Sequence, residues 1–255
     1  MKRVRIIPAL LIQKGGLVKS IRFKDHKYVG DPINAVKIFN EKEVDEIVVL
    51  DISASAEKRP PNIEKIKEIA SEAFMPLGYG GGITNLEEIK MLITAGVEKT
   101  ILNTAALTNP RLISDGAKYV GSQSIVVSID VKKNIWGKYK VYGMNGSKNT
   151  GLDPVAFARQ MEEAGAGEVL LNSIDKDGTF EGYDLDLISS VSSSVNIPVV
   201  AIGGASSTED FTGAIRAGAS AASAGSLFVF QRPLRAVLIS YPSQAELKKK
   251  VFEKI

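Results

Sequence analysis

The sequence has 255 residues, of which 44% are apolar and 24% charged, and its formal net charge is +3. This composition is typical of a globular protein with a large core, and the small, evenly spread charge excess does not favour a nucleic-acid partner. No segment approaches 18 uninterrupted apolar residues, so we expect no membrane partner. The chain has no cysteine, which excludes a cysteine nucleophile of its own. It starts with a strand pattern rather than an apolar leader, so we expect a cytoplasmic location.

Short apolar runs alternate with helix-length segments along the whole chain. Most runs are rich in β-branched residues and end in polar residues or glycine, which is typical of the buried strands of a parallel sheet. The predicted strands are residues 5–11, 46–51, 76–79, 99–103, 124–131, 168–173, 198–202 and 220–224.

Helical patterns fill the segments between these runs. Several begin with a residue that can cap a helix N-terminus, as in Asp31-Pro32, Asp153-Pro154 and Ser207. The predicted helices are residues 33–40, 62–74, 86–94, 110–118, 154–164, 185–194, 208–217 and 244–253. The stretch after the fifth strand, residues 132–151, is predicted to form a small hairpin.

Eight strand–helix units without a linker predict one (β/α)8 barrel, a single domain spanning residues 1–255. The alternative is a doubly wound sheet. An internal repeat disfavours it, because equivalent strands would then occupy inequivalent edge and central positions. Met75-Pro76 with Gly81-Gly82 recurs as Ile197-Pro198 with Gly203-Gly204. The repeat divides the barrel into two (β/α)4 halves.

The first strand of each half differs at one position that matters for chemistry. When residues 6–12 are aligned with residues 125–131, Leu11 stands where Asp130 stands. A carboxylate at a strand end in the barrel mouth can act as a general acid or base, and Asp130 is the strongest candidate. Asp51 and Asp175 also lie at strand ends and are further candidates for a general acid or base. The alternative for each is that its carboxylate only orients the loop that follows the strand.

Glycines and hydroxyl residues follow strands on both sides of the predicted mouth. Unblocked backbone N–H groups bind phosphate, commonly after strands seven and eight of such barrels. The first set is Gly82, Asn103 and Thr104, and the second is Asp177, Gly178, Gly204, Gly225 and Ser226. Two such sets favour a ligand with a phosphate at each end. The alternative is that the glycine pairs only form tight turns.

Charged residues begin four of the predicted strands, at Arg5, Glu46, Lys99 and Glu168. Alternate strands of a barrel contribute side chains to the same inward layer, which can bring these charges together. Buried charges are costly unless they are paired, and here two acids match two bases. The functional interpretation is a salt-bridged gate at the barrel floor. The alternative is that the charges point into solvent.

The only histidine, His26, lies in a polar segment where a surface role is expected, and no spacing of residues indicates a metal site or a cofactor. Several strings together resemble HisF, the cyclase subunit of imidazole glycerol phosphate synthase, over nearly the whole chain. The similar strings are Arg5-Ile6-Ile7-Pro8, Gly30-Asp31-Pro32, Leu50-Asp51-Ile52, Gly80-Gly81-Gly82-Ile83, Asn103-Thr104-Ala105, Lys148-Asn149-Thr150-Gly151 and the segment from Ser173 to Thr179.

The resemblance implies a barrel that works with a HisH-like glutaminase in a heterodimer. Ammonia from the glutaminase would pass through the barrel and react with a ribotide that carries two phosphates. The family assigns the two phosphate sets to the ends of this ligand and the four charged residues to the ammonia gate. It places Lys19 on a mobile loop after strand one. The family also uses two catalytic aspartates, of which this chain has only Asp130, because Leu11 occupies the other position.

Residues 8–11, 15–19 and 235–242 resemble a branch of HisF paralogues called second HisF or WbuZ, which is associated with surface polysaccharides. That branch implies ammonia delivery to a separate sugar amidotransferase and little or no cyclase activity. The alternatives are an authentic cyclase of histidine biosynthesis, with water or Asp175 replacing the missing carboxylate, and a non-enzymatic scaffold that keeps the phosphate sets as an effector site.

Overall fold

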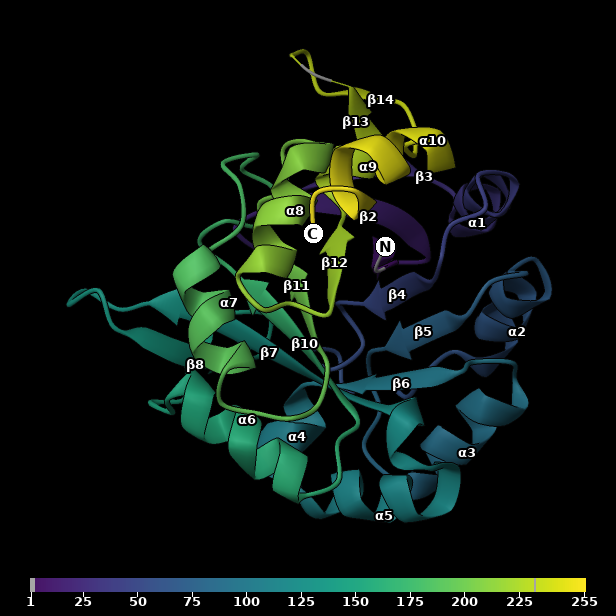
Figure 1. Ribbon diagram of the computed structural model, residues 1–255. Coiled ribbons are helices and arrows are strands. Elements are labelled where there is room, and N and C mark those ends of the chain that lie inside the picture. The colour runs from purple at the N-terminus through teal and green to yellow at the C-terminus, as the bar shows by residue number, and fades with distance from the viewer. Residues whose placement is uncertain (1–2, 232) are drawn as a thin grey trace.

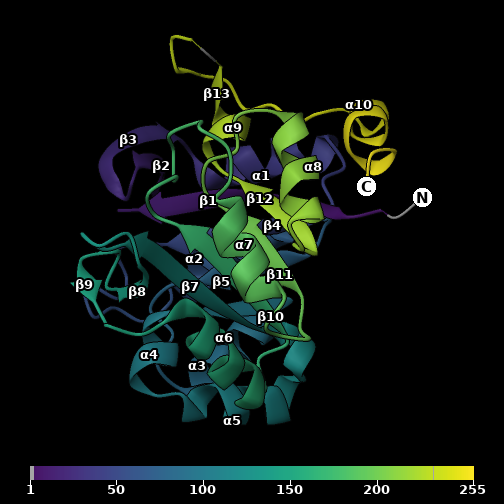
Figure 2. The ribbon, with the colours of Figure 1, turned by 60° about the vertical axis from the view of Figure 1, so that its left-hand side comes forward.

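The computed structural model describes residues 3–231 and 233–255. Parallel strands follow one another around a closed barrel, with helices outside them (Figures 1 and 2). In chain order the barrel strands are β1 (Arg5–Gln13), β4 (Ile47–Asp51), β5 (Leu77–Gly80), β6 (Lys99–Leu102), β7 (Ile125–Lys133), β10 (Glu168–Ser173), β11 (Val199–Ile202) and β12 (Ala221–Ala224). Pairing of β12 with β1 and of β7 with β10 closes the sheet. The predicted (β/α)8 barrel is confirmed.

The outer helices begin where the capping residues predicted. The Asp31 side chain accepts a hydrogen bond from the N–H of Asn34, Asp153 accepts from two N–H groups of the first turn, and Ser207 forms a capping box. The helices are α1 (Pro32–Glu41), α2 (Ile63–Ser71), α3 (Leu86–Thr94), α5 (Arg111–Val120), α6 (Pro154–Glu163), α7 (Leu185–Ser192), α8 (Thr208–Arg216) and α10 (Gln244–Leu247), which continues as a π-helical turn over Lys248–Phe252. Among the described residues, no helix has the length and apolarity to cross a membrane.

Alternation along the strands divides the core into two layers. On β1, Ile6 packs outward with the helices, whereas Ile7 belongs to a separate cluster inside the barrel. The inner cluster consists of Ile7, Ala9, Val48, Ile101, Val126, Leu170, Val200, Ile202 and Ala221, with Leu50 packed against it. The lumen between the two ends of the barrel is therefore lined by aliphatic side chains.

Two hairpins extend the strands at one end of the barrel. β2 (Gly16–Ile21) and β3 (Lys24–Gly30) form an antiparallel hairpin that pairs with β1, where the sequence analysis expected a mobile loop. Leu17 of β2 and Val29 of β3 are buried and belong to the core cluster, so the hairpin packs on the core through these side chains. The hairpin predicted after strand five is present as an extension of β7 with β8 (Tyr139–Gly143) and β9 (Lys148–Asn149).

Short elements follow two of the strands. α4 (Thr104–Thr108) follows β6, and α9 (Ser226–Val229) follows β12, where the sequence indicated a short extra helix. A small hairpin of β13 (Phe230–Gln231) and β14 (Ala236–Val237) comes next. It extends from the top of the molecule in Figure 1.

Aromatic packing joins α8 to α9 beneath this hairpin. The rings of Phe211 and Phe228 lie 6.0 Å apart, and Phe211 is fully buried.

We predict that Phe211→Ala lowers the free energy of unfolding by about 3–5 kcal/mol, because it leaves a cavity between helices. Urea unfolding measures this. The control Phe74→Ala removes a ring that is 83% exposed and should change stability by less than about 0.5 kcal/mol. Equal losses of stability in Phe211→Ala and Phe74→Ala would contradict the conclusion that the ring of Phe211 stabilises the packing of α8 against α9.

Candidate functional site

The four charged residues at the strand starts form one cluster at the floor of the barrel. Arg5 donates hydrogen bonds to both Glu46 and Glu168. The Nζ of Lys99 lies 2.9 Å from Oε2 of Glu46 and 2.7 Å from Oε2 of Glu168. Each base thus bridges both acids. The two glutamates are 3% and 4% exposed, so the alternative in which they point into solvent is wrong.

The two glutamates offset the effect of burial on Arg5. Burial by itself would lower the pKa of Arg5, but the hydrogen bonds and charges of Glu168 and Glu46 raise that pKa above its ordinary value. Ala221 is paired with Arg5 across the β1–β12 ladder and adds only a methyl group to the inner wall. The cluster lies at the floor of the barrel, and its function as a gate stays a prediction.

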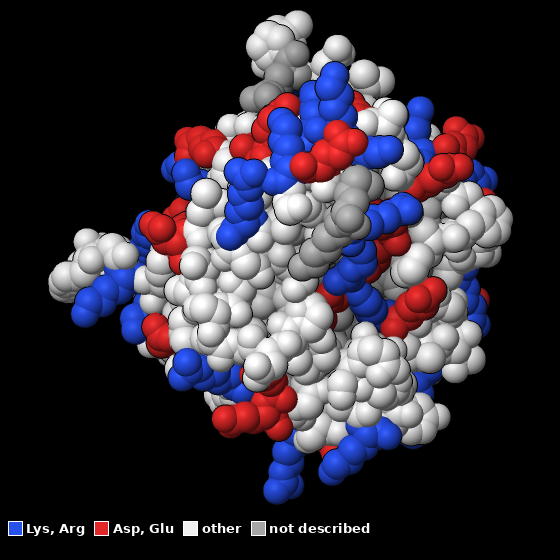
Figure 3. Space-filling model, viewed as in Figure 1, with Lys and Arg blue, Asp and Glu red and all other residues white. Residues whose placement is uncertain are grey.

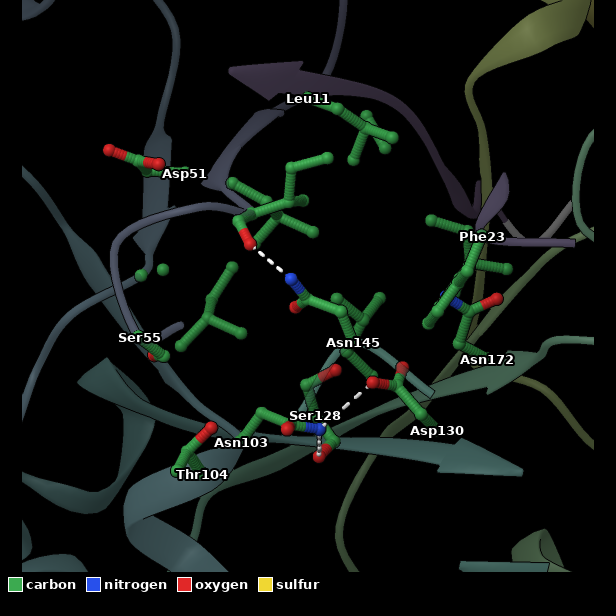
Figure 4. Close-up of a pocket in the computed structure, with 18 of the residues that line it drawn as sticks. Leu11, Phe23, Asp51, Ser55, Asn103, Thr104, Ser128, Asp130, Asn145 and Asn172 are labelled. Carbon is green, nitrogen blue, oxygen red and sulfur yellow. Dashed lines mark hydrogen bonds between the residues drawn. The ribbon is translucent and has the colours of Figure 1, made fainter. Parts of the chain in front are cut away.

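A cavity of about 120 Å³ opens at the other end of the barrel, among the carboxyl ends of the strands (Figure 4). Most of the predicted site residues meet there: Leu11, Lys19, Gly82, Asn103, Thr104, Asp130, Asp177, Gly225 and Ser226. Gly178 and Gly204 line a small adjoining pocket that shares Asp177, Gly225 and Ser226 with the main cavity. Both predicted phosphate sets therefore border one continuous region.

Asp130 is a buried carboxyl group in the wall of this cavity. The amide of Asn103 donates to Oδ2 of Asp130 at 3.1 Å and to the carbonyl of Ser128 at 3.0 Å. Burial, and secondly the charge of Asp177, raise the pKa of Asp130 to about 7, although hydrogen bonds from Asn172 and Asn103 act in the opposite direction. Near neutral pH the carboxyl group is poised to give or take a proton.

A lysine and a second carboxylate face this group. The β2–β3 hairpin carries Lys19 into the cavity, where it is 4% exposed and donates a hydrogen bond to the carbonyl of Ala9. Burial lowers the pKa of Lys19 to about 8, against the charge of Asp177. Burial likewise raises the pKa of Asp177, against Lys19 and the Ser20 hydroxyl, which donates to Asp177 at 3.0 Å. Three titratable groups with shifted pKa values, Asp130, Lys19 and Asp177, therefore line the cavity.

Leu11 borders the cavity from β1, beside Leu50 of β4 (Figure 4). The side chain of leucine cannot act as a general acid or base. Asp51 does not take this role, because its Oδ1 accepts from the N–H groups of Ser53 and Ala54, both at 3.1 Å. Asp175 accepts from the N–H of Lys133 at 2.8 Å and does not line the cavity. Both carboxylates orient loops.

The glycine pairs are required by the fold whatever they bind. Gly82 has a φ of +74°, and a Cβ there would lie 2.4 Å from the carbonyl oxygen of Arg59. Gly204 has a φ of +108°, and a Cβ there would lie 2.2 Å from the carbonyl oxygen of Gly182. The glycines alone therefore do not decide between turns and phosphate sites, and phosphate binding stays a prediction.

Sequence reasoning missed several residues of the cavity. Asn172 lies two positions beyond the inward-facing Leu170 on β10, so strand alternation could have found it. Its Oδ1 is buried without a hydrogen-bond partner among the described residues. Phe23 and Asn145 come from the two hairpins, and Asn145 donates to the carbonyl of Ile52 across the mouth. His26 is exposed as expected, yet it also borders the cavity.

The chain is similar to known proteins over almost all of its length. The family described as "Histidine biosynthesis protein" matches residues 5–233. A relative from Pseudomonas aeruginosa, named "Putative imidazole glycerol phosphate synthase subunit hisF2", is 51% identical over 97% of this chain and 99% of its own. "Putative imidazole glycerol phosphate synthase subunit HisF" from Leptospira interrogans is 49% identical over 96% and 98%. "Imidazole glycerol phosphate synthase subunit HisF" from Alkaliphilus metalliredigens is 45% identical over 88% and 89%.

The raised pKa of Asp130 predicts a pH-dependent effect on stability. In the folded protein that pKa is about 7, against an ordinary value of 3.8. The stability contribution of the protonated group is therefore fully present below pH 3.8 and is lost as the pH rises through about 7. We predict that Asp130→Asn is nearly neutral at pH 4 and stabilises the protein at pH 8 by up to roughly 4 kcal/mol. Urea unfolding at both pH values measures this, and a pH-independent difference would contradict it.

Proposed function

The chain belongs to the histidine biosynthesis protein family as a HisF-type subunit, and on that premise we propose that it conducts ammonia from a HisH-like glutaminase to an acceptor at the mouth of its barrel. The partner would dock at the floor, where Arg5, Glu46, Lys99 and Glu168 form the charge cluster. Glutamine would be hydrolysed in the partner, since this chain has no cysteine to serve as the nucleophile.

The interior of the barrel supports transport of a neutral molecule. Above the charge cluster, the inner wall consists of aliphatic side chains such as Val48, Val126 and Leu170. An apolar lumen admits ammonia, whereas ammonium would lose its hydration without compensation. Gly78 of β5 contributes no side chain, and a Cβ there would come within 3.3 Å of both Val48 and Ile101. The passage is therefore narrow enough for a small residue to matter.

Leu11 is the observation that carries the proposal of weak or absent cyclase activity. The cavity has Asp130 on one side and this aliphatic side chain at the symmetry-related position. Removal of one general acid or base typically costs about 10²–10⁴-fold in rate. Ammonia that reaches such a mouth would be consumed elsewhere. We propose a separate enzyme that amidinates a sugar of a surface polysaccharide, which rests on the similarity of residues 8–11, 15–19 and 235–242 to the paralogue branch.

A second candidate function has its own support. Asp130, Asp177 and Lys19 lie in one cavity with shifted pKa values, so another group could supply the proton that Leu11 cannot. Under this reading the chain is the cyclase of imidazole glycerol phosphate synthase, the name that the relative from Alkaliphilus metalliredigens carries. The two phosphate sets would then bind the two ends of the ribotide.

Cyclase turnover distinguishes the two candidates. We predict that the purified chain with excess ammonium salt and the ribotide of histidine biosynthesis shows no turnover, and that Leu11→Asp gains it, because the variant restores the missing proton carrier. The assay follows formation of imidazole glycerol phosphate. Efficient turnover by the unchanged chain would establish the cyclase instead. If both proteins are inactive, Leu11 does not explain the lack of cyclase activity. The cavity then no longer supports the proposal that the chain delivers ammonia to another enzyme.

The charge cluster predicts how glutamine hydrolysis is coupled to product formation. Lys99→Ala should leave the fold intact, since Arg5 still bridges both glutamates, but it should open the floor and let ammonia escape. With the partner glutaminase and acceptor present, we expect more glutamine consumed per product. The control Lys90→Ala removes an exposed ion pair with Glu87 and should not change this ratio. An unchanged ratio in Lys99→Ala and in Arg5→Ala would refute the gate.

A further inference from the structure

The hairpin of β7 and β8 ends in an exposed apolar tip. Ile135 is 91% exposed and Trp136, the single tryptophan of the chain, is 67% exposed. The tip has a defined shape, because the side chain of Asn134 accepts hydrogen bonds from the N–H groups of Trp136 at 2.9 Å and Lys138 at 3.0 Å. Two large apolar side chains are thus held in solvent by an ordered turn.

Lysines predominate in the sequence of this hairpin, and the carboxylates at its base, Asp175 and Asp184, come from other elements and accept hydrogen bonds from the N–H of Lys133 and the hydroxyl of Tyr139. Residues 131–150 contain five lysines and no aspartate or glutamate. Lys132 and Lys138, on either side of the tip, form no ion pair with a carboxylate of the described residues. Lys133 lies over the ring of Tyr139, with Nζ 4.8 Å from its centroid. In Figure 3 the projection at the left is accordingly white at its end and blue behind it.

The hairpin reaches outward from the barrel. Figure 1 shows its tip at the left of the molecule, and the hairpin continues the carboxyl end of β7, whereas the charge cluster of the floor lies at the amino ends of the strands. Its base is fixed, because the hydroxyl of Tyr139 donates to Asp184 at 2.6 Å and Val141 is buried. A large surface can therefore contact the tip while the floor of the barrel stays accessible.

We propose that this tip docks on an anionic lipid surface, with Ile135 and Trp136 in the interfacial region and the lysines near the headgroups. Tryptophan and lysine are typical of contacts with anionic membrane interfaces. Protein interfaces are instead depleted in lysine. Single-stranded nucleic acid would use the ring of Trp136 but not Ile135, the more exposed of the two. The expectation of no membrane partner rested on the lack of a long apolar segment, and a contact at the membrane interface does not require such a segment.

Trp136 makes the proposal directly measurable. Its fluorescence is recorded as the full chain is titrated with phosphatidylcholine vesicles, with or without phosphatidylglycerol, and sedimentation quantifies binding. We expect a blue shift and co-sedimentation only with the anionic vesicles. Trp136→Ser should abolish most of the co-sedimentation. Lys132→Gln with Lys138→Gln should weaken binding by roughly 25-fold, since each lysine near an anionic surface contributes about fivefold.

A matched control separates a local site from general attraction. Lys248→Gln with Lys249→Gln removes the same charge from the C-terminal helical turn and should leave vesicle binding unchanged. Equal weakening by both double variants would overturn the proposal, as would binding that survives Trp136→Ser. Poly-L-glutamate and a single-stranded oligonucleotide serve as alternative probes. A response of Trp136 to either of these but not to anionic vesicles would replace the lipid surface by an acidic protein or a nucleic acid.

Discussion

Closure of the parallel sheet is the constraint on which the rest of the structure depends. When β7 pairs with β10 and β12 pairs with β1, every second side chain of each strand is forced into one shared lumen. That geometry brings Arg5 and Glu168 into contact although they lie far apart in the sequence. It also gathers the loops at the carboxyl ends of the strands around one cavity. The charge cluster at the floor and the cavity at the mouth therefore lie at the two ends of the same barrel interior.

The floor shows how a barrel tolerates charge in its interior. Desolvation of four ionised groups is unfavourable, and it is offset only because each base contacts both acids. Such an arrangement contributes little net stability compared with an apolar layer of the same volume. Its geometry is nevertheless specific, because each base contacts both acids and displacement of one base leaves both acids with a partner.

The mouth is chemically asymmetric although the backbone repeats. Asp130, Asp177 and Lys19 all have pKa values moved toward neutrality, chiefly by burial, whereas the symmetry mate of Asp130, Leu11, has no titratable group. Shifts of this kind are typical of functional sites. The β2–β3 hairpin contributes to them, because it carries Lys19 into a site that solvent would otherwise fill. One of the three groups with shifted pKa values therefore comes from a hairpin outside the eight barrel strands.

The sequence by itself determined the barrel, its two halves, the helix starts at Asp31, Asp153 and Ser207, and the absence of a carboxylate at position 11. These features are local patterns or repeats, and each is encoded in a short stretch of residues. Only the tertiary structure decided that Glu46 and Glu168 are buried together, that the segment around Lys19 is a hairpin, and that Asn172 and Asn145 reach the cavity. These outcomes depend on barrel closure and on contacts between distant segments, where side-chain direction and burial are set by neighbours that no local pattern specifies.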